Sequence, residues 1–186
     1  MKQKKAAAAG PEWEETSIRD FLGFAPARIA DEWMLISAGE GASGAWNTMT
    51  ASWGGLGVLW GRDTAFVFVR PTRYSFAFFN EQALFSLSFF DRSRHEALEF
   101  CGAYSGRDHD KAEAAGLTPI VFTGGRSAGG IGFQEASETI VCRKLYTHDF
   151  DPARFLDPAI SGNYPAKDYH RMFIGEILGL RVRRGG

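Results

Sequence analysis

The sequence predicts a mainly β fold, an antiparallel β-barrel with a few packed helices. Short runs rich in β-branched and aromatic residues outnumber helical patterns, and turns containing glycine or proline separate them. The regular alternation of strand and helix that builds a parallel sheet is absent. The chain has 186 residues, 45% of them hydrophobic, and one core commonly organises a chain of this size. We expect a single domain over residues 16–186, preceded by a disordered segment over residues 1–15.

The first half of the chain contains most of the clear strand patterns. A weak helical pattern over residues 16–31, with a loop around Pro26, precedes them. Glycine-containing turns then separate the runs, and Pro71 ends one of them because proline cannot donate to a ladder. The expected strands are Trp33–Ser37, Thr48–Ser52, Leu56–Trp60, Thr64–Arg70 and Leu84–Phe90.

The second half mixes helices and longer strands. We expect one helix that starts at Thr72 as its N-cap, and another from His95 to Tyr104. A third, from Lys111 to Ala115, has Asp108 as a candidate cap, and a short helix covers Asp151–Phe155. The expected strands are Pro119–Phe122, Gly132–Phe133, Ala136–Thr147 and Met172–Val182.

Composition excludes several classes of function. The formal net charge is -1, so the chain lacks the basic surface expected of a nucleic-acid-binding protein. The basic cluster Arg181, Arg183 and Arg184 is interpreted as a solvated end. No run approaches the roughly 20 apolar residues of a transmembrane helix, so no membrane association is expected. Two cysteines without a CxxC motif are typical of a reducing, cytoplasmic location.

Two other motifs are interpreted as structural. His148-Asp149-x-Asp151 offers metal-ligand types, but no second cluster supports it, so we expect solvated loop residues and no metal site. Gly39-x-Gly41-x-x-Gly44 has the spacing of a dinucleotide fingerprint. It leads into an expected strand, whereas the fingerprint requires a helix N-terminus for the pyrophosphate. We therefore reject a Rossmann site. Whether the glycine-rich loop 124–132 contacts a ligand is left open.

A row of hydroxyl groups is more informative. Thr48, Thr50 and Ser52 alternate along an expected strand, so they share one face with Trp46. Met49, Ala51 and Trp53 take the other face. Hydroxyls beside exposed backbone amides can receive a phosphate or a ring carbonyl. An ordinary amphipathic strand is the alternative interpretation, and periodicity does not separate the two.

A candidate anion site follows in the chain. Arg70 ends an expected strand, and Pro71-Thr72-Arg73-Tyr74-Ser75 opens an expected helix. Two guanidinium groups, two hydroxyls and a helix N-terminus together favour an anion. Lys111, close in sequence to Arg107, is a further candidate cation.

Three ordered segments resemble the flavin reductase-like family with an FMN-binding split β-barrel, close to the flavoredoxins. They are Asn47-Thr48-Met49-Thr50-Ala51-Ser52-Trp53-Gly54-Gly55, Arg70-Pro71-Thr72-Arg73-Tyr74-Ser75 and Asp168-Tyr169-His170-Arg171-Met172-Phe173-Ile174-Gly175-Glu176-Ile177. The resemblance runs from about Trp33 to Leu180. It implies a homodimer with FMN near the subunit interface.

The resemblance also implies roles for individual residues. Asn47, Thr48, Met49, Thr50, Ala51, Ser52 and Trp53 would lie along the isoalloxazine ring and the ribityl chain. Ser52, Arg70, Arg73, Tyr74 and Ser75, with Pro71 and Thr72 in the same segment, would hold the phosphate end. Tyr104, Arg107 and Lys111 would approach from a loop. His170 would lie near the flavin or the nicotinamide.

The implied function is an NAD(P)H-dependent flavin reductase or related FMN oxidoreductase. The chemistry would belong to the flavin, so no residue is required as a strong acid or base. Two alternatives stay open: a flavoredoxin-type electron carrier with tightly bound FMN, and a non-catalytic interaction domain that keeps the barrel. The sequence does not show whether NADH or NADPH is the electron donor, or whether FMN is a prosthetic group or an exchangeable substrate. The electron acceptor also stays open, and a redox partner protein is one candidate.

Overall fold

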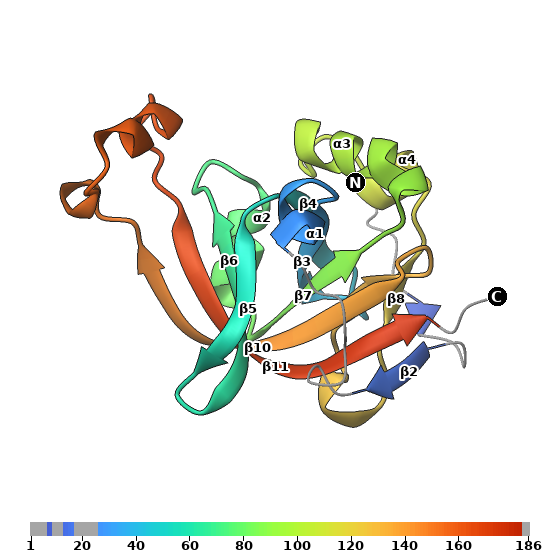
Figure 1. The fold of residues 1–186 in the computed structure, drawn as a ribbon. Coiled ribbons are helices and arrows are strands. Elements are labelled where there is room, and N and C mark those ends of the chain that lie inside the picture. Colours follow the sequence, from blue (N-terminus) through green and yellow to red (C-terminus); the bar gives the residue numbers. More distant parts are fainter. Residues whose placement is uncertain (1–6, 9–12, 17–25, 184–186) are drawn as a thin grey trace.

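The computed structural model describes residues 7–8, 13–16 and 26–183, and its regular structure consists mainly of β-strands (Figure 1). The strands are β1 (Ala7–Ala8), β2 (Trp13–Thr16), β3 (Met34–Glu40), β4 (Ala45–Ala51), β5 (Gly54–Leu59), β6 (Arg62–Val69), β7 (Leu84–Phe89), β8 (Pro119–Val121), β9 (Ile131–Phe133), β10 (Glu138–Asp149) and β11 (Arg171–Arg183). The α-helices are α1 (Pro26–Ala30), α2 (Ser75–Glu81), α3 (His95–Ala103) and α4 (Lys111–Ala114), and short 3-10 turns are η1 (Arg92–Arg94), η2 (Gly125–Ser127), η3 (Pro152–Arg154) and η4 (Pro158–Asn163).

The main sheet has the strand order β4-β3-β7-β10-β11-β6-β5, and β2 pairs with β11 beside it. Every pairing in this sheet is antiparallel. A smaller sheet contains β1, β8 and β9. The mainly β, antiparallel fold with a few helices is therefore confirmed.

Strand β10 extends beyond its neighbour β7, whereas β11 stays paired with β6 from Arg171 onward. β10 pairs with β7 only as far as Arg143, whereas it pairs with β11 from Glu138 to Asp149. Register shifts near Cys142 and Lys144 bend the pair, as β-bulges do. The end of β10 and the start of β11 lead into an arm formed by residues 150–170, seen in orange and red at the left of Figure 1.

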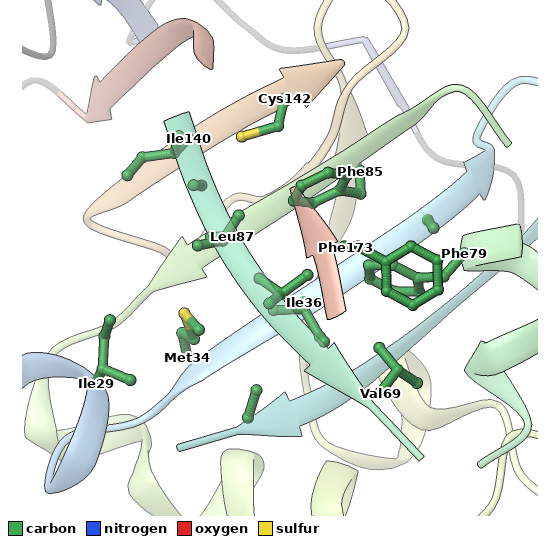
Figure 2. Close-up of a cluster of buried hydrophobic side chains, with 14 of the residues drawn as sticks. Ile29, Met34, Ile36, Val69, Phe79, Phe85, Leu87, Ile140, Cys142 and Phe173 are labelled. Atoms are coloured by element: carbon green, nitrogen blue, oxygen red, sulfur yellow. The ribbon is translucent and has the colours of Figure 1, made fainter. Parts of the chain in front are cut away.

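Two apolar cores lie on opposite faces of the sheet. The first is enclosed by the strands and α2, and Figure 2 shows Ile36, Phe79, Phe85 and Phe173 packed within it. The second lies between the other face, helices α3 and α4, and strands β8 and β9, with Leu98 and other fully or nearly fully buried residues. Strand β3 is buried on both faces, so its apolar run is continuous and does not alternate.

Several local expectations differ from the structure. Within the segment 1–15, for which disorder was expected, residues 7–8 and 13–15 lie in strands β1 and β2; the remaining positions of that segment lie outside the described residues. β2 is ordered by backbone pairing with β11, a contact distant in sequence. The helical pattern over residues 16–31 lies largely outside the described residues, and Pro26 begins α1 where a loop was expected. Proline suits a first helical position because no intrahelical partner is lost.

Helix caps and one charged residue also differ from expectation. Helix α2 begins at Ser75 after Tyr74, so Thr72 is not its cap. Asp110, and not Asp108, caps α4 by accepting a hydrogen bond from the Glu113 amide. Arg181 is buried and donates to the Gly124 carbonyl at 2.5 Å, so it is not part of a solvated end. The third member of that basic cluster, residue 184, lies outside the described residues.

Glycine at position 175 is required by the packing of the first core. A Cβ there would lie 2.5 Å from the Phe85 ring and 2.8 Å from Cys142 Cβ. We predict that Gly175→Ala lowers the free energy of unfolding by about 1–3 kcal/mol, because overpacking displaces the ring. Gly55→Ala in β5 is the matched control, since nothing lies within 4 Å of that Cβ position. Urea unfolding measures both, and equal effects would contradict the packing argument.

Candidate functional site

A groove made of three adjoining pockets runs along β4. The aromatic pocket has a volume of about 220 Å³ and is lined by Met49, Thr50, Ala51, Ser52, Trp53, Phe68, Arg70, Arg73 and His170. The cationic pocket, about 110 Å³, is lined by Asn47, Met49, Thr72, Arg73, Tyr74, Ser75, Ala103, Tyr104, Ser105, Gly106, Arg107 and Lys111. The outer pocket, about 530 Å³, is lined by Ser43, Gly44, Ala45, Tyr74, Phe78, Gly106 and Arg107.

The groove brings together segments that are far apart in the chain. β4 supplies one wall, and the end of β6 with the turn before α2 supplies Arg70 to Ser75. The loop between α3 and α4 covers the cationic pocket, and His170 comes from the base of the arm. The aromatic and cationic pockets share Met49 and Arg73, so they are continuous.

The cationic pocket combines a buried ammonium group with polar side chains. Lys111 Nζ donates to the carbonyls of Thr48 at 3.0 Å and Cys101 at 2.5 Å. An ammonium has three N–H donors, so one is left for a ligand. Burial lowers the pKa of Lys111 to about 8, with the Arg73 charge adding to this and Cys101 opposing it. An anion in the pocket would therefore stabilise the charged form.

Other donors of the cationic pocket come from the turn and from β4. Asn47 Nδ2 donates to Ser75 Oγ at 2.7 Å, which ties β4 to the first residue of α2. Arg73 Nη1 donates to the Gly102 carbonyl at 3.0 Å. A guanidinium has five N–H donors, so this one bond leaves Arg73 able to bind an anion as well.

The aromatic pocket is bounded by Trp53 and His170. Their ring centroids are 4.8 Å apart, and the Trp53 side chain is 41% exposed. His170 Nδ1 lies 2.9 Å from the Tyr164 hydroxyl. The pKa of His170 is lowered to about 4, mainly by burial and then by the Arg70 charge, while the Asp168 carboxylate opposes this shift. The imidazole is therefore neutral near pH 7.

Arg70, which the resemblance places among the residues that hold the phosphate end, is already paired within the chain. Its Nη1 donates to both carboxylate oxygens of Asp168, at 3.0 and 2.9 Å, and its Nη2 donates to the Asn163 carbonyl at 2.8 Å. The guanidinium also lies over the Tyr164 ring, 5.2 Å from its centroid. Arg70 thus fastens the arm against the groove, and its hydrogen bonds lower the pKa of Asp168.

Two members of the hydroxyl row, Thr48 and Thr50, bond to other parts of the chain, while Thr50 and Ser52 line the aromatic pocket. The Thr48 hydroxyl accepts from Ser37 at 2.9 Å and donates to the Ile36 carbonyl at 3.2 Å. The Thr50 hydroxyl donates to the Leu98 carbonyl of α3. Thr48 is 1% exposed, so its hydroxyl does not reach the groove. The expectation that the whole row receives a ligand is wrong for Thr48, because its hydrogen bonds close the sheet.

The structure brings together nearly all of the predicted site residues. Each of them lines the aromatic or the cationic pocket, except Thr48 and the exposed Pro71. Sequence reasoning missed Phe68 and Gly106. Alternation along β6 is a signal that Phe68 faces away from the first core. The position of Gly106 follows from packing, because a Cβ there would collide with Asn47 Oδ1.

The remaining motifs lie elsewhere or serve other purposes. Gly44 leads into β4, as expected, but it also lines the outer pocket. Within residues 26–183, no group of three His, Cys, Asp or Glu side chains could hold a metal ion. Asp149 instead pairs with Arg171 at 2.7 Å. Loop 124–132 lines none of the three pockets. Among the described helices, none is long and apolar enough to cross a membrane.

Comparison with solved structures identifies the fold. No family model and no curated protein sequence matches the chain. Flavoredoxin of Desulfovibrio vulgaris matches at 23% identity with a TM-score of 0.59, over 81% of this chain and 68% of that one. An FMN-binding domain of a flavin reductases-like enzyme from Shewanella baltica matches at 16% identity and TM-score 0.63, over 92% and 77%. An NADH:FAD oxidoreductase from Streptomyces globisporus matches at 13% identity and TM-score 0.58, over 80% of this chain and 74% of that one. The chain has the split-barrel fold of these proteins.

The lowered pKa of His170 predicts a pH-dependent stability. Between pH 6.5 and about 4 the unfolded chain binds a proton at His170 that the folded protein does not. Stability should therefore fall as the pH falls through this range. We predict a shallower fall for His170→Gln, measured by urea unfolding at several pH values. The exposed His148→Gln is the matched control, and an unchanged slope in His170→Gln would contradict the prediction.

Proposed function

We propose that the groove binds FMN and that the protein is a flavin-dependent oxidoreductase. In this proposal Arg73, Ser75 and Lys111 hold the phosphate, while Trp53 and His170 border the ring. The observation that carries the proposal is the juxtaposition of an aromatic pocket with a cationic one. Flavin mononucleotide has the same two parts, a flat conjugated ring and a terminal phosphate.

The chemistry of the lining residues fits this cofactor. Guanidinium, ammonium and hydroxyl donors are the groups that bind phosphate in proteins. The aromatic pocket offers Met49, Trp53 and Phe68, whose side chains suit the apolar faces of a conjugated ring. In the aromatic pocket, the charge of Arg70 is balanced by the Asp168 carboxylate. The cationic pocket is therefore the more favourable place for an anion.

Bound flavin would supply hydride and electron transfer, and the chain would supply position and electrostatics. The neutral imidazole of His170 borders the ring end without adding charge. Its hydrogen bond to Tyr164 and the clamp of Arg70 on Asp168 hold this wall in place. NADH or NADPH is the proposed electron donor, with free flavin or a partner protein as the acceptor.

A flavoredoxin-type electron carrier is the second candidate. The exposed edge of Trp53 at the ring end favours it, because an electron carrier must let a partner approach the cofactor. The similar fold of flavoredoxin from Desulfovibrio vulgaris supports the same candidate.

Visible spectroscopy tests these functions together. We expect purified protein to bind FMN and the bound flavin to bleach on anaerobic addition of NADH or NADPH. Retained flavin that neither nucleotide reduces would favour the electron carrier. Absence of FMN binding would overturn both and leave a non-catalytic interaction domain.

Arg73 gives the phosphate assignment a direct test. Charge-assisted hydrogen bonds contribute about 1.5–3 kcal/mol, so Arg73→Ala should weaken FMN binding by about tenfold or more. Arg92→Ala is the matched control, because Arg92 pairs with Glu32 at 3.5 Å and lines none of the three pockets. Fluorescence titration measures both dissociation constants. Equal affinity in the two variants would remove Arg73 from the site.

We also propose a homodimer in the cytoplasm. The dimer is supported by large exposed apolar side chains on the arm and the β5–β6 hairpin, which a second copy of the chain would cover. They are Val58, Trp60, Tyr146 and Leu156. The thiols of Cys101 and Cys142 are free and buried, which agrees with a reducing compartment. We predict that Trp60→Glu shifts the protein from dimer to monomer in light-scattering chromatography. A monomeric wild-type protein would contradict the dimer.

A further inference from the structure

Tyr164 is a buried tyrosine of the arm, and its hydroxyl has a single described acceptor. The side chain is 4% exposed. It is enclosed by the Phe155 ring at 5.9 Å, by the Tyr169 ring at 5.0 Å and by the Arg70 guanidinium at 5.2 Å from its centroid. The hydroxyl lies 2.9 Å from His170 Nδ1. Among the described residues, no other acceptor is available for the phenol proton.

This geometry decides which nitrogen of His170 carries the imidazole proton. Burial raises the pKa of Tyr164, so the phenol keeps its proton, and the lowered pKa of His170 leaves the imidazole with one proton. Either the hydroxyl donates to Nδ1, or Nδ1–H donates to the hydroxyl. The second arrangement leaves the buried phenol O–H unpaired, which is unfavourable. The hydroxyl therefore donates to Nδ1, and the imidazole proton lies on Nε2.

The Nε2–H group is left for a ligand in the aromatic pocket. His170 lines that pocket, and the structure gives Nε2 no hydrogen-bond partner among the described residues without burying it. The charged groups around the imidazole are Arg70, Arg73 and Asp168. Arg70 and Asp168 pair with each other at 2.9 Å. The imidazole therefore offers the pocket a neutral N–H donor at a fixed position.

A fixed N–H donor suits the polar edge of a flavin ring. This edge carries carbonyl oxygens and ring nitrogens, which accept hydrogen bonds. Reduction makes the ring more electron-rich, so a donor aimed at its carbonyl end stabilises the reduced form more than the oxidised form. Hydrogen bonds to the ring are one means by which a protein adjusts the electronic properties of its cofactor.

We propose that Tyr164 fixes His170 in the tautomer that donates from Nε2 to the carbonyl end of the flavin ring, and that this hydrogen bond raises the reduction potential of bound FMN. The inference rests on the proposed function, because it takes the ring of FMN to lie in the aromatic pocket. Tyr164 acts through the imidazole, so it is a positioning residue. Arg70 supports it by packing over the Tyr164 ring.

Nitrogen NMR of isotope-labelled protein without ligand tests the tautomer. The sequence has four histidines, and the signals missing in His170→Gln are those of His170. We expect a proton on Nε2 and none on Nδ1 in the wild type, and a loss of this preference in Tyr164→Phe. Tyr169→Phe is the matched control and should keep the wild-type tautomer. Tyr169 packs in the same aromatic group, and its hydroxyl has no hydrogen bond among the described residues.

Redox titration of the FMN-loaded protein tests the contact with the ring. Loss of the donor in His170→Phe should weaken the binding of reduced FMN relative to oxidised FMN by about tenfold, which lowers the two-electron potential by about 30 mV. Tyr164→Phe should show part of this shift, because its imidazole still populates the donating tautomer. His170→Gln keeps an N–H donor, so its potential should stay close to that of the wild type, as should that of Tyr169→Phe.

Either of two results would overturn the inference. One is a wild-type protein with its His170 proton on Nδ1, or a Tyr164→Phe variant with an unchanged tautomer. The other is an equal potential in His170→Phe and Tyr169→Phe. Both leave the proposed FMN site standing, because FMN affinity is measured in the same series. A wild-type protein that binds no FMN would instead overturn the proposed function, while the tautomer is still read from the ligand-free protein.

Discussion

The pairing of β10 with β11 is the constraint on which the rest of the structure depends. β10 joins β7 on one side and β11 on the other, and β11 in turn pairs with β6. The two halves of the sheet are thus connected through one continuous hydrogen-bonded ladder. The pair also leads into the arm, and the base of that arm holds His170 beside Trp53 of the segment that follows β4.

A second set of contacts turns this scaffold into a groove. Lys111 ties helix α3 to β4 through two carbonyls, and Arg70 ties the arm to the end of β6 through Asp168. Both are cations held by oxygen acceptors, but their consequences for a ligand differ. Arg70 meets a full negative charge, whereas Lys111 and Arg73 bond to neutral carbonyls. Net positive charge therefore gathers in the cationic pocket, away from the aromatic one.

The proposed chemistry follows from this separation of charge. The aromatic pocket, lined by Met49, Trp53 and Phe68, suits a conjugated ring, and the cationic pocket suits phosphate. The groove does not stop there, since the outer pocket continues from the cationic pocket past Tyr74 and Arg107.

The sequence by itself determined the mainly β class, because alternation and turn residues are local signals that survive without tertiary context. It also identified most of the groove: Asn47 to Trp53 and Arg70 to Ser75 are contiguous segments whose residue types are informative on their own. Only the tertiary structure decided that Thr48 is turned into the sheet, that Arg70 is paired with Asp168, and that Trp13–Thr16 joins β11. Each of these depends on a partner far away in the chain, and hydrogen bonds and ion pairs between distant segments leave no periodic trace in the sequence.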